Sequence, residues 1–560
     1  MQLNEFQKII TENNLDAYIV THNNMFIGQD ILPEENKIQE LCGFSGSAGT
    51  LLVFQKKAIL FVDGRYTLQA AQQVDTSQIE VITTHESLAT WLQNNIFENL
   101  KIGYNAWCHT IGEVDYWNRV LKRFEFCEDK KNLLDIRPSN KECNIFEHDI
   151  AFAGISMDEK ISQLSEYIQK NKCDAYLITA CDCVSWLLNL RSDCLPDTPI
   201  FRAYALINAL GEVSLFTNNF ASLTKELEKY SGKTIGLAYN NAPKAVFSIM
   251  KEQGIWVENL NNPILLWKAV KNPVERDNLR QAHIRDALSV CSFMYWLEQN
   301  WKNKTECDIV QKLHDLRSQN KNYFSESFPT IAGFGSNGAI VHYVPTAETN
   351  AALKEGSLLL VDSGAQYLNG TTDITRTFCI GTPSSEMIND YTLVLKAHIA
   401  LASCLYPQGT SGQSLDIIAR SQLWKQGKDY AHGTGHGVGF FLNVHEGPQS
   451  ISSRSSQTPL QEGMIVSIEP GFYKENAYGI RIENLVEIVS KHFDETDTNM
   501  LRFEPLTLVP FESELMNKEM LTQEERKFIN GYHQKILCVL RPHIKDSNLL
   551  SWLGNKCREI

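Results

Sequence analysis

The chain has 560 residues, of which 43% are hydrophobic and 21% charged, a globular composition that excludes a mainly disordered or collagen-like protein. At about 150 residues per domain, this length predicts three or four domains. The net charge of −14 results from 52 basic and 66 acidic residues without a basic patch, which excludes a dedicated nucleic-acid surface.

Three further observations concern the cellular setting. No apolar stretch approaches the roughly 18 residues that span a bilayer, and the first residues lack the basic and apolar regions of a signal peptide. The 14 cysteines include no CxxC pair, and Cys181 and Cys183 are the closest two. We therefore expect a cytoplasmic protein with reduced cysteines that binds neither membranes nor nucleic acid.

The first part of the chain has the pattern of an α/β domain. After a helical opening, residues 16–21 form a β-rich run, and two strands at 51–54 and 58–62 are joined by a polar turn. The same order of patterns returns at 173–179, 204–207 and 213–216, with an offset of 174 − 16 = 158 residues. We predict two related α/β domains in tandem; the alternative is a chance similarity between amphipathic strands.

The rest of the chain changes character twice. Pro273 fits the first turn of a helix, and a helical pattern continues to about residue 320. From there to about residue 510 the sequence is rich in short strands and glycine turns, and it then ends in helices. We therefore place the domains at 1–137, 138–268, 269–510 and 511–560.

Five residues of the third domain are candidate metal ligands. Each lies at or near a strand end or in a glycine-rich loop, and they are Asp362, Asp373, His436, Glu469 and Glu483. Four carboxylates and one imidazole suit a pair of divalent ions such as Mn²⁺, Co²⁺ or Zn²⁺. Four carboxylates can lie together only if cations neutralise them, so the set predicts metal binding.

The spacing of the two aspartates leaves a question about register. Asn369-Gly370 predicts a hairpin turn between them. With that pair as a two-residue loop, Asp373 pairs with Gln366, which shares a face with Asp362 but lies roughly 13 Å away along the strand. A bulge or a wider loop must shift the register before both carboxylates can serve one pair of ions.

Several motifs surround these residues, and their order is specific. In the third domain they are residues 362–367, 370–377, 432–439, 467–473 and 479–484, with further matches at 328–331, 339–343 and 443–448. The earlier domains contribute 43–50, 62–66 and 185–191. Together they resemble the pita-bread metallopeptidases, and within that family most closely the long, three-domain, cytosolic type of Xaa-Pro aminopeptidase (aminopeptidase P).

The resemblance implies a fold and an activity. The fold is α/β (α+β), with two tandem creatinase-like α/β N-terminal domains followed by a C-terminal pita-bread catalytic domain. The activity is that of a dinuclear metal-dependent aminopeptidase, which hydrolyses the N-terminal Xaa-Pro peptide bond through a metal-bridging hydroxide. The five candidate ligands would bind two divalent ions, Mn²⁺ foremost and Zn²⁺ or Co²⁺ as alternatives, with Asp373 and Glu483 bridging.

The resemblance also implies roles for the residues around the ions. His342 and His445 would stabilise the charge that develops on the scissile carbonyl, and Glu469 would handle the proton of the nucleophile. Four residues match substrate-binding positions: His432, Arg481, Tyr473 and Arg65. Arg481 can equally be the structural partner of a neighbouring carboxylate.

Proline as the second residue demands a special site. An Xaa-Pro bond has no N–H and its ring restricts the preceding residue, so an apolar pocket for the ring is expected. The aromatic candidates for its wall are Phe440, Phe441, Tyr343 and Tyr473, although aromatic side chains can instead belong to the core. The expected partners are therefore peptides with proline as the second residue.

Two other readings of the same chain stay open. A prolidase-type dipeptidase would share the fold but would have to recognise the free carboxylate of its second residue. A metal-free pita-bread scaffold would have lost ligands, whereas all five are present here. The tail from 512 to 560, with Leu549, Leu550 and Trp552, resembles the C-terminal extension of the family and suggests a homodimer.

Overall fold

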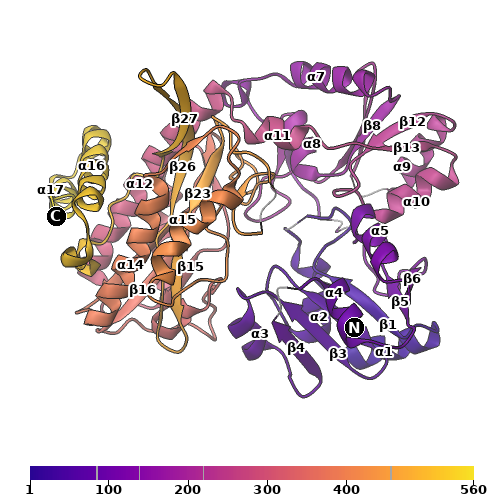
Figure 1. Cartoon of the computed structure of the whole chain (residues 1–560), viewed down its shortest axis with the longest axis horizontal. Helices are drawn as coiled ribbons and strands as arrows, with labels where there is room; N and C mark the ends of the chain where they lie inside the picture. The colour runs from indigo at the N-terminus through magenta and orange to yellow at the C-terminus, as the bar shows by residue number, and fades with distance from the viewer. Residues whose placement is uncertain (29, 84–85, 138, 140, 218–219, 455–456) are drawn as a thin grey trace. The chain divides into compact units, whose positions relative to one another are not determined.

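The computed structural model describes residues 1–28, 30–83, 86–137, 139, 141–217, 220–454 and 457–560 (Figure 1). The chain forms two compact units. Unit 1 contains Met1–His148, Ile155–Leu195 and Ile200–Ile264. Unit 2 contains Asp149–Gly154, Pro196–Pro199 and Leu265–Ile560. The predicted boundaries at 137, 268 and 510 stay predictions.

The first sheet of unit 1 has the strand order β4-β3-β2-β1-β5-β6 (Figure 1). Its strands are β1 (Ala17–Thr21), β2 (Thr50–Phe54), β3 (Ala58–Val62), β4 (Ile79–Thr83), β5 (Lys101–Tyr104) and β6 (Glu125–Glu128). The helices of this region are α1 (Leu3–Glu12), α2 (Lys37–Cys42), α3 (Thr67–Gln73), α4 (Leu88–Asn95) and α5 (Ile111–Val120). Hydrophobic clusters bury both faces of this sheet.

The second sheet of unit 1 has the order β11-β10-β8-β12-β13. Its strands are β8 (Ala175–Ile178), β10 (Tyr204–Asn208), β11 (Val213–Phe216), β12 (Thr234–Leu237) and β13 (Trp256–Asn259). The accompanying helices are α7 (Met157–Lys170), α8 (Cys181–Leu187), α9 (Phe220–Leu227) and α10 (Lys244–Glu252). A small separate sheet pairs β7 (Ile145–Glu147) with β9 (Leu190–Ser192).

The two large sheets repeat one topology. In the first, β1 pairs antiparallel with β2 and parallel with β5. In the second, β8 pairs antiparallel with β10 and parallel with β12. Each sheet then continues with an antiparallel strand on one side and a parallel strand on the other. The predicted tandem α/β repeat is therefore confirmed, and the first sheet has β4 in addition.

One pair of cysteines contradicts the expectation that all of them are reduced. Cys143 and Cys194 form a disulfide with their Cα atoms 5.0 Å apart. The physical reason is the β7–β9 ladder, in which Ile145 lies opposite Ser192. Continuing that register by two residues brings the two cysteines face to face, at a separation that suits a disulfide. The other twelve cysteines are free.

Unit 2 combines antiparallel sheets with long helices. Its three larger sheets have the orders β14-β17-β18, β15-β16-β19 and β20-β27-β26-β23. Their strands are β14 (Tyr323–Glu326), β15 (Ile331–Phe334), β16 (Ser357–Ser363), β17 (Ala365–Tyr367), β18 (Gly370–Thr371), β19 (Ile374–Ile380), β20 (Leu405–Pro407), β23 (Ile465–Ile468), β26 (Asn484–Phe493) and β27 (Thr498–Pro505). Two-stranded ladders add β21 (Gly435–His436), β22 (Ser450–Ile451), β24 (Gly471–Lys474) and β25 (Tyr478–Arg481).

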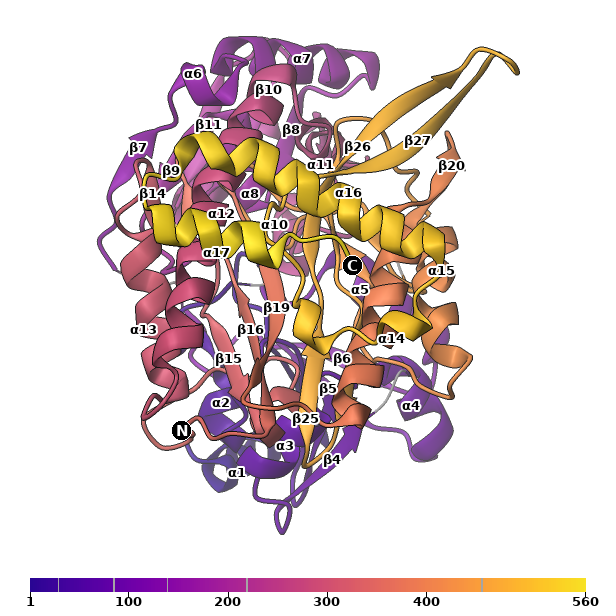
Figure 2. The ribbon, with the colours of Figure 1, turned by 90° about the vertical axis from the view of Figure 1, so that its left-hand side faces the viewer.

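Helices cover the sheets of unit 2 and bury its largest hydrophobic core against them. They are α6 (Ile150–Ala153), α11 (Ile264–Ala269), α12 (Pro273–Asn300), α13 (Glu306–Arg317), α14 (Ser385–Ala402), α15 (Gly412–Trp424), α16 (Gln523–Leu540) and α17 (Ser547–Lys556). Figure 2 shows α16 and α17, in yellow, lying across α12. The C-terminal helices therefore belong to the same core as the sheets.

The predicted helix after Pro273 is confirmed, and its start has a clear cause. Pro273 is the first helical residue, and the Asn272 side chain accepts the Glu275 N–H at 3.0 Å. The Glu275 carboxylate accepts the Asn272 N–H at 2.9 Å in return, so two otherwise unpaired donors are satisfied. The helical pattern to residue 320 consists of two helices, because Thr305 caps a new helix, α13.

Two helices lie where the sequence predicted short strands. They are α14 and α15, and Ser384 caps the first by accepting the Met387 N–H at 3.2 Å. In α14 almost every side chain from 390 to 401 is buried, so the apolar residues do not mark one face. A helix buried on all sides lacks the helical period that would separate it from a buried strand.

The helices of the described residues include none with the length and the hydropathy of a membrane span.

Candidate metal centre

A hairpin brings Asp362 and Asp373 together. Asp362 lies in β16, where it pairs with Thr375 of β19. Beyond it, Tyr367 pairs with Gly370, so the two loop residues are Leu368 and Asn369. The predicted loop at Asn369-Gly370 is therefore wrong by one position.

That shift moves the pairing of the two strands by two residues. The stagger between Asp362 and Asp373 along the strand therefore falls from four residues, or roughly 13 Å, to two. Asp373 now comes opposite Gly364, which is two residues from Asp362 on the same face. Side chains in this diagonal relation lie close enough to bind the same metal ion. A Cβ on Gly364 would come 2.0 Å from the Thr372 carbonyl oxygen. Only glycine permits this close approach, which sets the two aspartates side by side.

His436 reaches the same place from a strand that runs beside β23. Its backbone N–H donates to Ser467 Oγ at 2.9 Å. A Cβ on Gly435 would come 2.0 Å from the Ser467 carbonyl oxygen, so the strand lies this close only because residue 435 is glycine. The Nδ1 of His436 contacts the Gly437 carbonyl oxygen at 3.0 Å, which leaves Nε2 toward the carboxylates.

Two glutamates complete the cluster, each at the end of a strand. Glu469 follows β23, and its backbone N–H donates to the Thr434 carbonyl oxygen at 2.8 Å. Glu483 lies between β25 and β26, and its Oε2 accepts the Thr375 hydroxyl at 2.6 Å. Both side chains therefore start from firmly bonded backbone.

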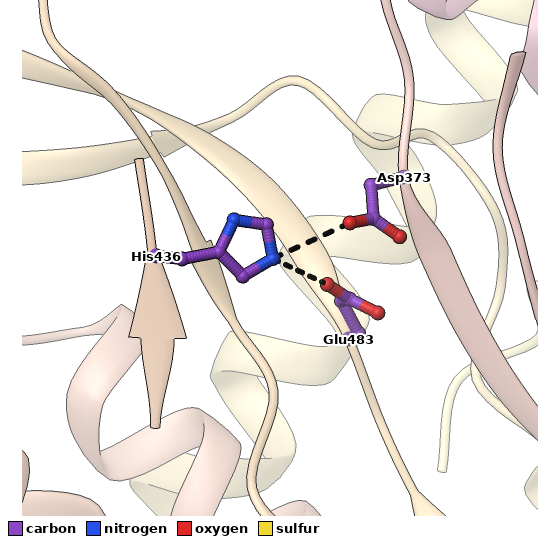
Figure 3. A group of neighbouring side chains, drawn as sticks. All are labelled: Asp373, His436 and Glu483. Carbon is purple, nitrogen blue, oxygen red and sulfur yellow. Dashed lines mark ion pairs between the residues drawn. The ribbon is translucent and has the colours of Figure 1, made fainter. Parts of the chain in front are cut away.

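The carboxylates converge on one imidazole nitrogen (Figure 3). His436 Nε2 lies 3.4 Å from Asp373 Oδ2, 3.6 Å from Glu469 Oε1 and 4.0 Å from Glu483 Oε1. Ligand atoms of Asp373, His436 and Glu483 all lie within 4.8 Å of one another. Asp362 is held beside them by Arg481, whose Nη2 donates to Asp362 Oδ2 at 2.6 Å. Four of the five predicted ligands therefore lie around one nitrogen, and the charge of Asp362 is close enough to raise the pKa of the other three carboxyls.

Burial makes this cluster electrostatically unfavourable on its own. Burial, joined by the charges of Asp362 and Glu469 and opposed by His436, raises the pKa of Asp373 to about 7. Burial and the neighbouring carboxylates also raise the pKa of Glu483 well above its usual range. For His436, burial is outweighed by Asp373 and Glu469, which raise its pKa to about 9. The cluster therefore holds protons until other positive charge replaces them.

The donor set fits divalent metal ions. Asp362 Oδ1 and Asp373 Oδ1 are buried and have no hydrogen-bond partner among the described residues. A buried carboxylate oxygen without a donor is costly, and a cation in the cluster would satisfy both oxygens. Oxygen ligands with one imidazole suit the harder divalent ions.

A chain of polar contacts extends from the cluster to His432. Arg481 Nη1 donates to the Tyr473 hydroxyl at 2.6 Å, and that hydroxyl lies 2.8 Å from His432 Nε2. Burial and the Arg481 charge hold the pKa of His432 well below its usual range, so its ring is neutral. Burial outweighs the same charge at Tyr473 and raises its pKa to about 12. Arg481 is thus the structural partner of a neighbouring carboxylate, and its contact with substrate stays a prediction.

The two other histidines lie at the edge of this cluster. The His445 ring is 4.3 Å from the His436 ring, centroid to centroid, and the residue is exposed. The next residue, Glu446, is fixed by buried ion pairs with Lys268 at 2.8 Å and Lys271 at 2.6 Å. His342 is half-buried and close enough to His432 to lower the pKa of that residue.

Four candidates have other surroundings. Arg65 belongs to unit 1, where its guanidinium donates to Asp63 at 2.7 and 2.9 Å. Phe440 packs in a small core with Leu279 and Leu485. Phe441 is 0% exposed, and Tyr343 directs its hydroxyl to a buried glutamate. Among the proposed pocket aromatics, Tyr473 is the one that contacts the polar residues of the cluster.

Sequence reasoning missed residues that hold the ligands. Thr375 donates to Glu483 and accepts from Arg481 Nε at 3.1 Å. Arg376 is buried and donates to the Glu483 carbonyl oxygen at 2.7 Å. The period-2 alternation of β19 was a usable signal, because residues 373, 375 and 377 share the face that turns to the cluster.

The family comparisons match four parts of the chain. Metallopeptidase family M24 matches residues 277–490. Two models of the creatinase/prolidase N-terminal domain match residues 2–137 and 136–234. The C-terminal region of peptidase M24 matches residues 499–560. The cluster lies within the first of these matches.

Similar proteins cover nearly the whole chain. Aminopeptidase P1 of Lotus japonicus is 33% identical, over 96% of this chain and 96% of the relative. Xaa-Pro aminopeptidase 1 of Dictyostelium discoideum is 34% identical, over 100% and 96%. The crystal structure of X-prolyl aminopeptidase from Caenorhabditis elegans, described as a cytosolic enzyme with a dinuclear active site, has a TM-score of 0.91 and 31% identity, over 98% of this chain and 95% of that one.

Proposed function

We infer, from the premise that this chain belongs to metallopeptidase family M24, that it is an Xaa-Pro aminopeptidase with a dinuclear metal active site. Its order of domains is the expected one, with two creatinase-like α/β domains before the pita-bread catalytic domain. The observation that carries this conclusion is the convergence of three carboxylates on His436 in a chain with full-length aminopeptidase relatives.

We propose that the two ions are held by Asp362, Asp373, His436, Glu469 and Glu483. The distances around His436 Nε2 support this set, as do the unsatisfied buried oxygens of the two aspartates. When bound, two divalent ions would lower the pKa of a water molecule and polarise the scissile carbonyl. Mn²⁺ is the ion we propose, with Zn²⁺ and Co²⁺ as alternatives, and the bridging ligands would be Asp373 and Glu483.

We propose that Glu469 holds the proton that leaves the nucleophile. Burial raises the pKa of its carboxyl, while the charges of His436 and Arg481 oppose that shift. Its side chain keeps 18% of its surface exposed, so a substrate can reach it. A carboxyl with a raised pKa can accept and return a proton near neutral pH.

The histidines and Arg481 would bind and orient the peptide. His342 and His445 would contact the scissile carbonyl, where a donor is most useful as negative charge develops. His432 and Tyr473 are joined by a 2.8 Å contact and would form one wall of the site together with Arg481. The free N-terminal amine of a peptide could bind one of the ions that the cluster would hold, which would limit cleavage to the first residue. Arg65 is proposed as a further substrate contact.

The substrates we propose are peptides with proline as the second residue. We also propose a cytoplasmic location, and a homodimer formed through the C-terminal region. All five proposed ligands are present in the sequence, which argues against a metal-free scaffold. A dipeptidase differs from an aminopeptidase in the length of peptide that it accepts, so substrate length separates these two.

A small peptide panel tests the activity. With added Mn²⁺, the protein should release arginine from Arg-Pro-Pro and should act much more slowly on Arg-Ala-Pro. The loss with alanine comes from the missing ring contacts, since an extra methylene in a pocket is worth roughly 1–3 kcal/mol. Cleavage of Gly-Pro without cleavage of Arg-Pro-Pro would favour a dipeptidase. Equal rates with proline and alanine would leave only a general aminopeptidase.

A further inference from the structure

Glu306 holds both ends of the loop that carries His342. Glu306 is the first residue of α13, and it is 0% exposed. The loop comprises residues 334–351 and begins at Phe334, the last residue of β15. Its first N–H, from Phe334, donates to Glu306 Oε1 at 2.7 Å. Its last N–H, from Ala351, donates to Glu306 Oε2 at 2.8 Å. One carboxylate therefore closes the 334–351 loop.

The same carboxylate also binds the middle of the loop. Asn337 Nδ2 donates to Glu306 Oε1 at 3.0 Å, and the Tyr343 hydroxyl lies 2.8 Å from Glu306 Oε2. Asn337 also donates to the Tyr343 hydroxyl at 2.9 Å, so the proton of that hydroxyl is shared between Glu306 Oε2 and the Thr349 carbonyl oxygen, which also lies 2.8 Å away. All four partners of Glu306 are donors. A carboxylate, which only accepts, satisfies them all, whereas a glutamine amide would set its own donors against some of them.

The carboxylate of Glu306 is buried without a neighbouring cation among the described residues. Among the described residues, no basic side chain lies within ion-pairing distance of this carboxylate. Its position at the start of α13 is favourable, since the N-terminus of a helix stabilises negative charge. Hydrogen bonds to an ionised acceptor are shorter and stronger than neutral ones. Because its hydrogen-bond donors all belong to the 334–351 loop, the buried carboxylate of Glu306 holds these groups of the loop in place.

The bonded residues lie directly next to His342. Tyr343 follows His342 in the chain, and its N–H donates to the Ile340 carbonyl oxygen at 3.1 Å. The earlier part of the loop is pressed onto β25, because a Cβ on Gly479 would come 1.7 Å from the Gly338 carbonyl oxygen. β25 ends at Arg481. The 334–351 loop is thus fixed by Glu306 on one side and by a strand of the metal centre on the other.

We propose that Glu306 is a positioning residue for the peptidase reaction, which sets His342 at the scissile carbonyl by anchoring the 334–351 loop through Tyr343, Asn337 and the two terminal N–H groups. This role rests on the proposed function, because it acts through His342. It also accounts for Tyr343, which serves as an anchor of this loop with its hydroxyl turned to Glu306.

The test is a double-mutant cycle on Arg-Pro-Pro cleavage with E306Q and H342A. E306Q alone should lower kcat on the order of 10–100-fold, the usual effect of losing a residue that orients an active-site group. KM and the Mn²⁺ affinity measured by calorimetry should stay within about threefold, since neither depends on His342 in this scheme. In the H342A background E306Q should cost less than about threefold, because residues that act as one unit are not additive.

Two further variants complete the experiment. E348Q changes an exposed glutamate of the same loop, whose carboxylate binds Thr346, and should leave kcat within about twofold. Y343F removes one anchor and should lower kcat by a smaller factor than E306Q. In a crystal structure of E306Q, His342 should be displaced, while Asp373 and His436 keep their places.

Each outcome decides the matter. Equal losses for E306Q with and without His342, or an unchanged kcat, would overturn the role of Glu306. If E306Q does not fold, Y343F provides the test. The loss of kcat that Y343F causes should then disappear in the H342A background, and a loss that persists there would overturn the role of the loop anchor. A wild-type protein that does not cleave Arg-Pro-Pro would instead overturn the proposed function itself.

Discussion

Replacement of Asp373 by asparagine changes charge with little change in shape, and its effect on metal binding can be worked out. Asp373 is 4% exposed, and its Oδ1 has no donor among the described residues. Loss of a ligand or of its support typically lowers metal affinity by about 10–100-fold. At a Mn²⁺ concentration 100 times the wild-type dissociation constant, the ion stabilises the wild type by about 2.7 kcal/mol. With 100-fold weaker binding, the gain falls to about 0.4 kcal/mol.

Thermal unfolding with and without Mn²⁺ measures this difference. The wild type should gain roughly 2–4 °C, and Asp373→Asn less than about 1 °C, together with at least about a hundredfold loss of activity. Asp390→Asn is the matched control, because Asp390 is also 4% exposed but binds Lys428 and Tyr478. It should lower the midpoint and keep the metal-dependent gain. A full metal response in Asp373→Asn would refute the assignment of this residue as a ligand.

Without metal, the replacement of Asp373 by asparagine should not lower the thermal stability of the protein above neutral pH. Because the folded pKa of Asp373 is about 7 and the unfolded one about 3.9, its contribution to stability is present below pH 4 and is lost as the pH rises to 7. At pH 8 its ionisation costs the metal-free fold up to about 4 kcal/mol, at 1.36 kcal/mol per pKa unit. An asparagine avoids this cost, so metal-free Asp373→Asn should melt no lower than metal-free wild type at pH 8. A clearly lower midpoint would contradict the electrostatic account.

Three other predictions concern single side chains. His342→Ala and His445→Ala should each lower kcat roughly 10²–10³-fold with unchanged metal content, because their contacts form mainly in the transition state; a loss of metal would show that they are ligands or supports. Burial, with a smaller effect of Arg376, lowers the pKa of His533 to about 4, so stability present above pH 6.5 should be lost toward pH 4 by up to about 3 kcal/mol. His533→Gln should show a smaller drop in thermal midpoint between pH 7 and pH 4.5, and an unchanged drop would contradict this role.

The sequence was informative where residues close in the chain decide the structure. The hairpins of both α/β domains, the start of α12 and the grouping of Asp373, His436 and Glu483 were all predictable from short patterns. The ligands could be grouped because each follows a strand or lies in a glycine-rich loop, where side chains from different strands can meet.

Other features depend on contacts between distant segments. The loop at Leu368-Asn369 differs from the Asn-Gly preference because the strands on both sides pair in a single register from Asp362 to Tyr367. Long β16–β19 pairing therefore overrides the local turn preference. The helix α14 was missed for the related reason that burial on all sides removes its helical pattern.

The residues that support the site were the least predictable. Glu306 binds donors that lie 28 to 45 residues further along the chain, and nothing near it in sequence indicates them. Arg376 likewise binds the Glu483 carbonyl oxygen across 107 residues. The disulfide between Cys143 and Cys194 required the β7–β9 register to be known first. Such contacts follow from the assembled fold, which a single sequence does not display.

The most direct test of the account is an anomalous difference map from crystals of this protein soaked in Mn²⁺. It should contain two peaks roughly 3.5–4 Å apart, the separation of two-metal hydrolytic sites. Asp373 and Glu483 should lie within bonding distance of both peaks, Asp362 and Glu469 should each bind one of them, and one peak should also contact His436 Nε2. A single peak, or two peaks bound by other residues, would contradict the proposed dinuclear centre.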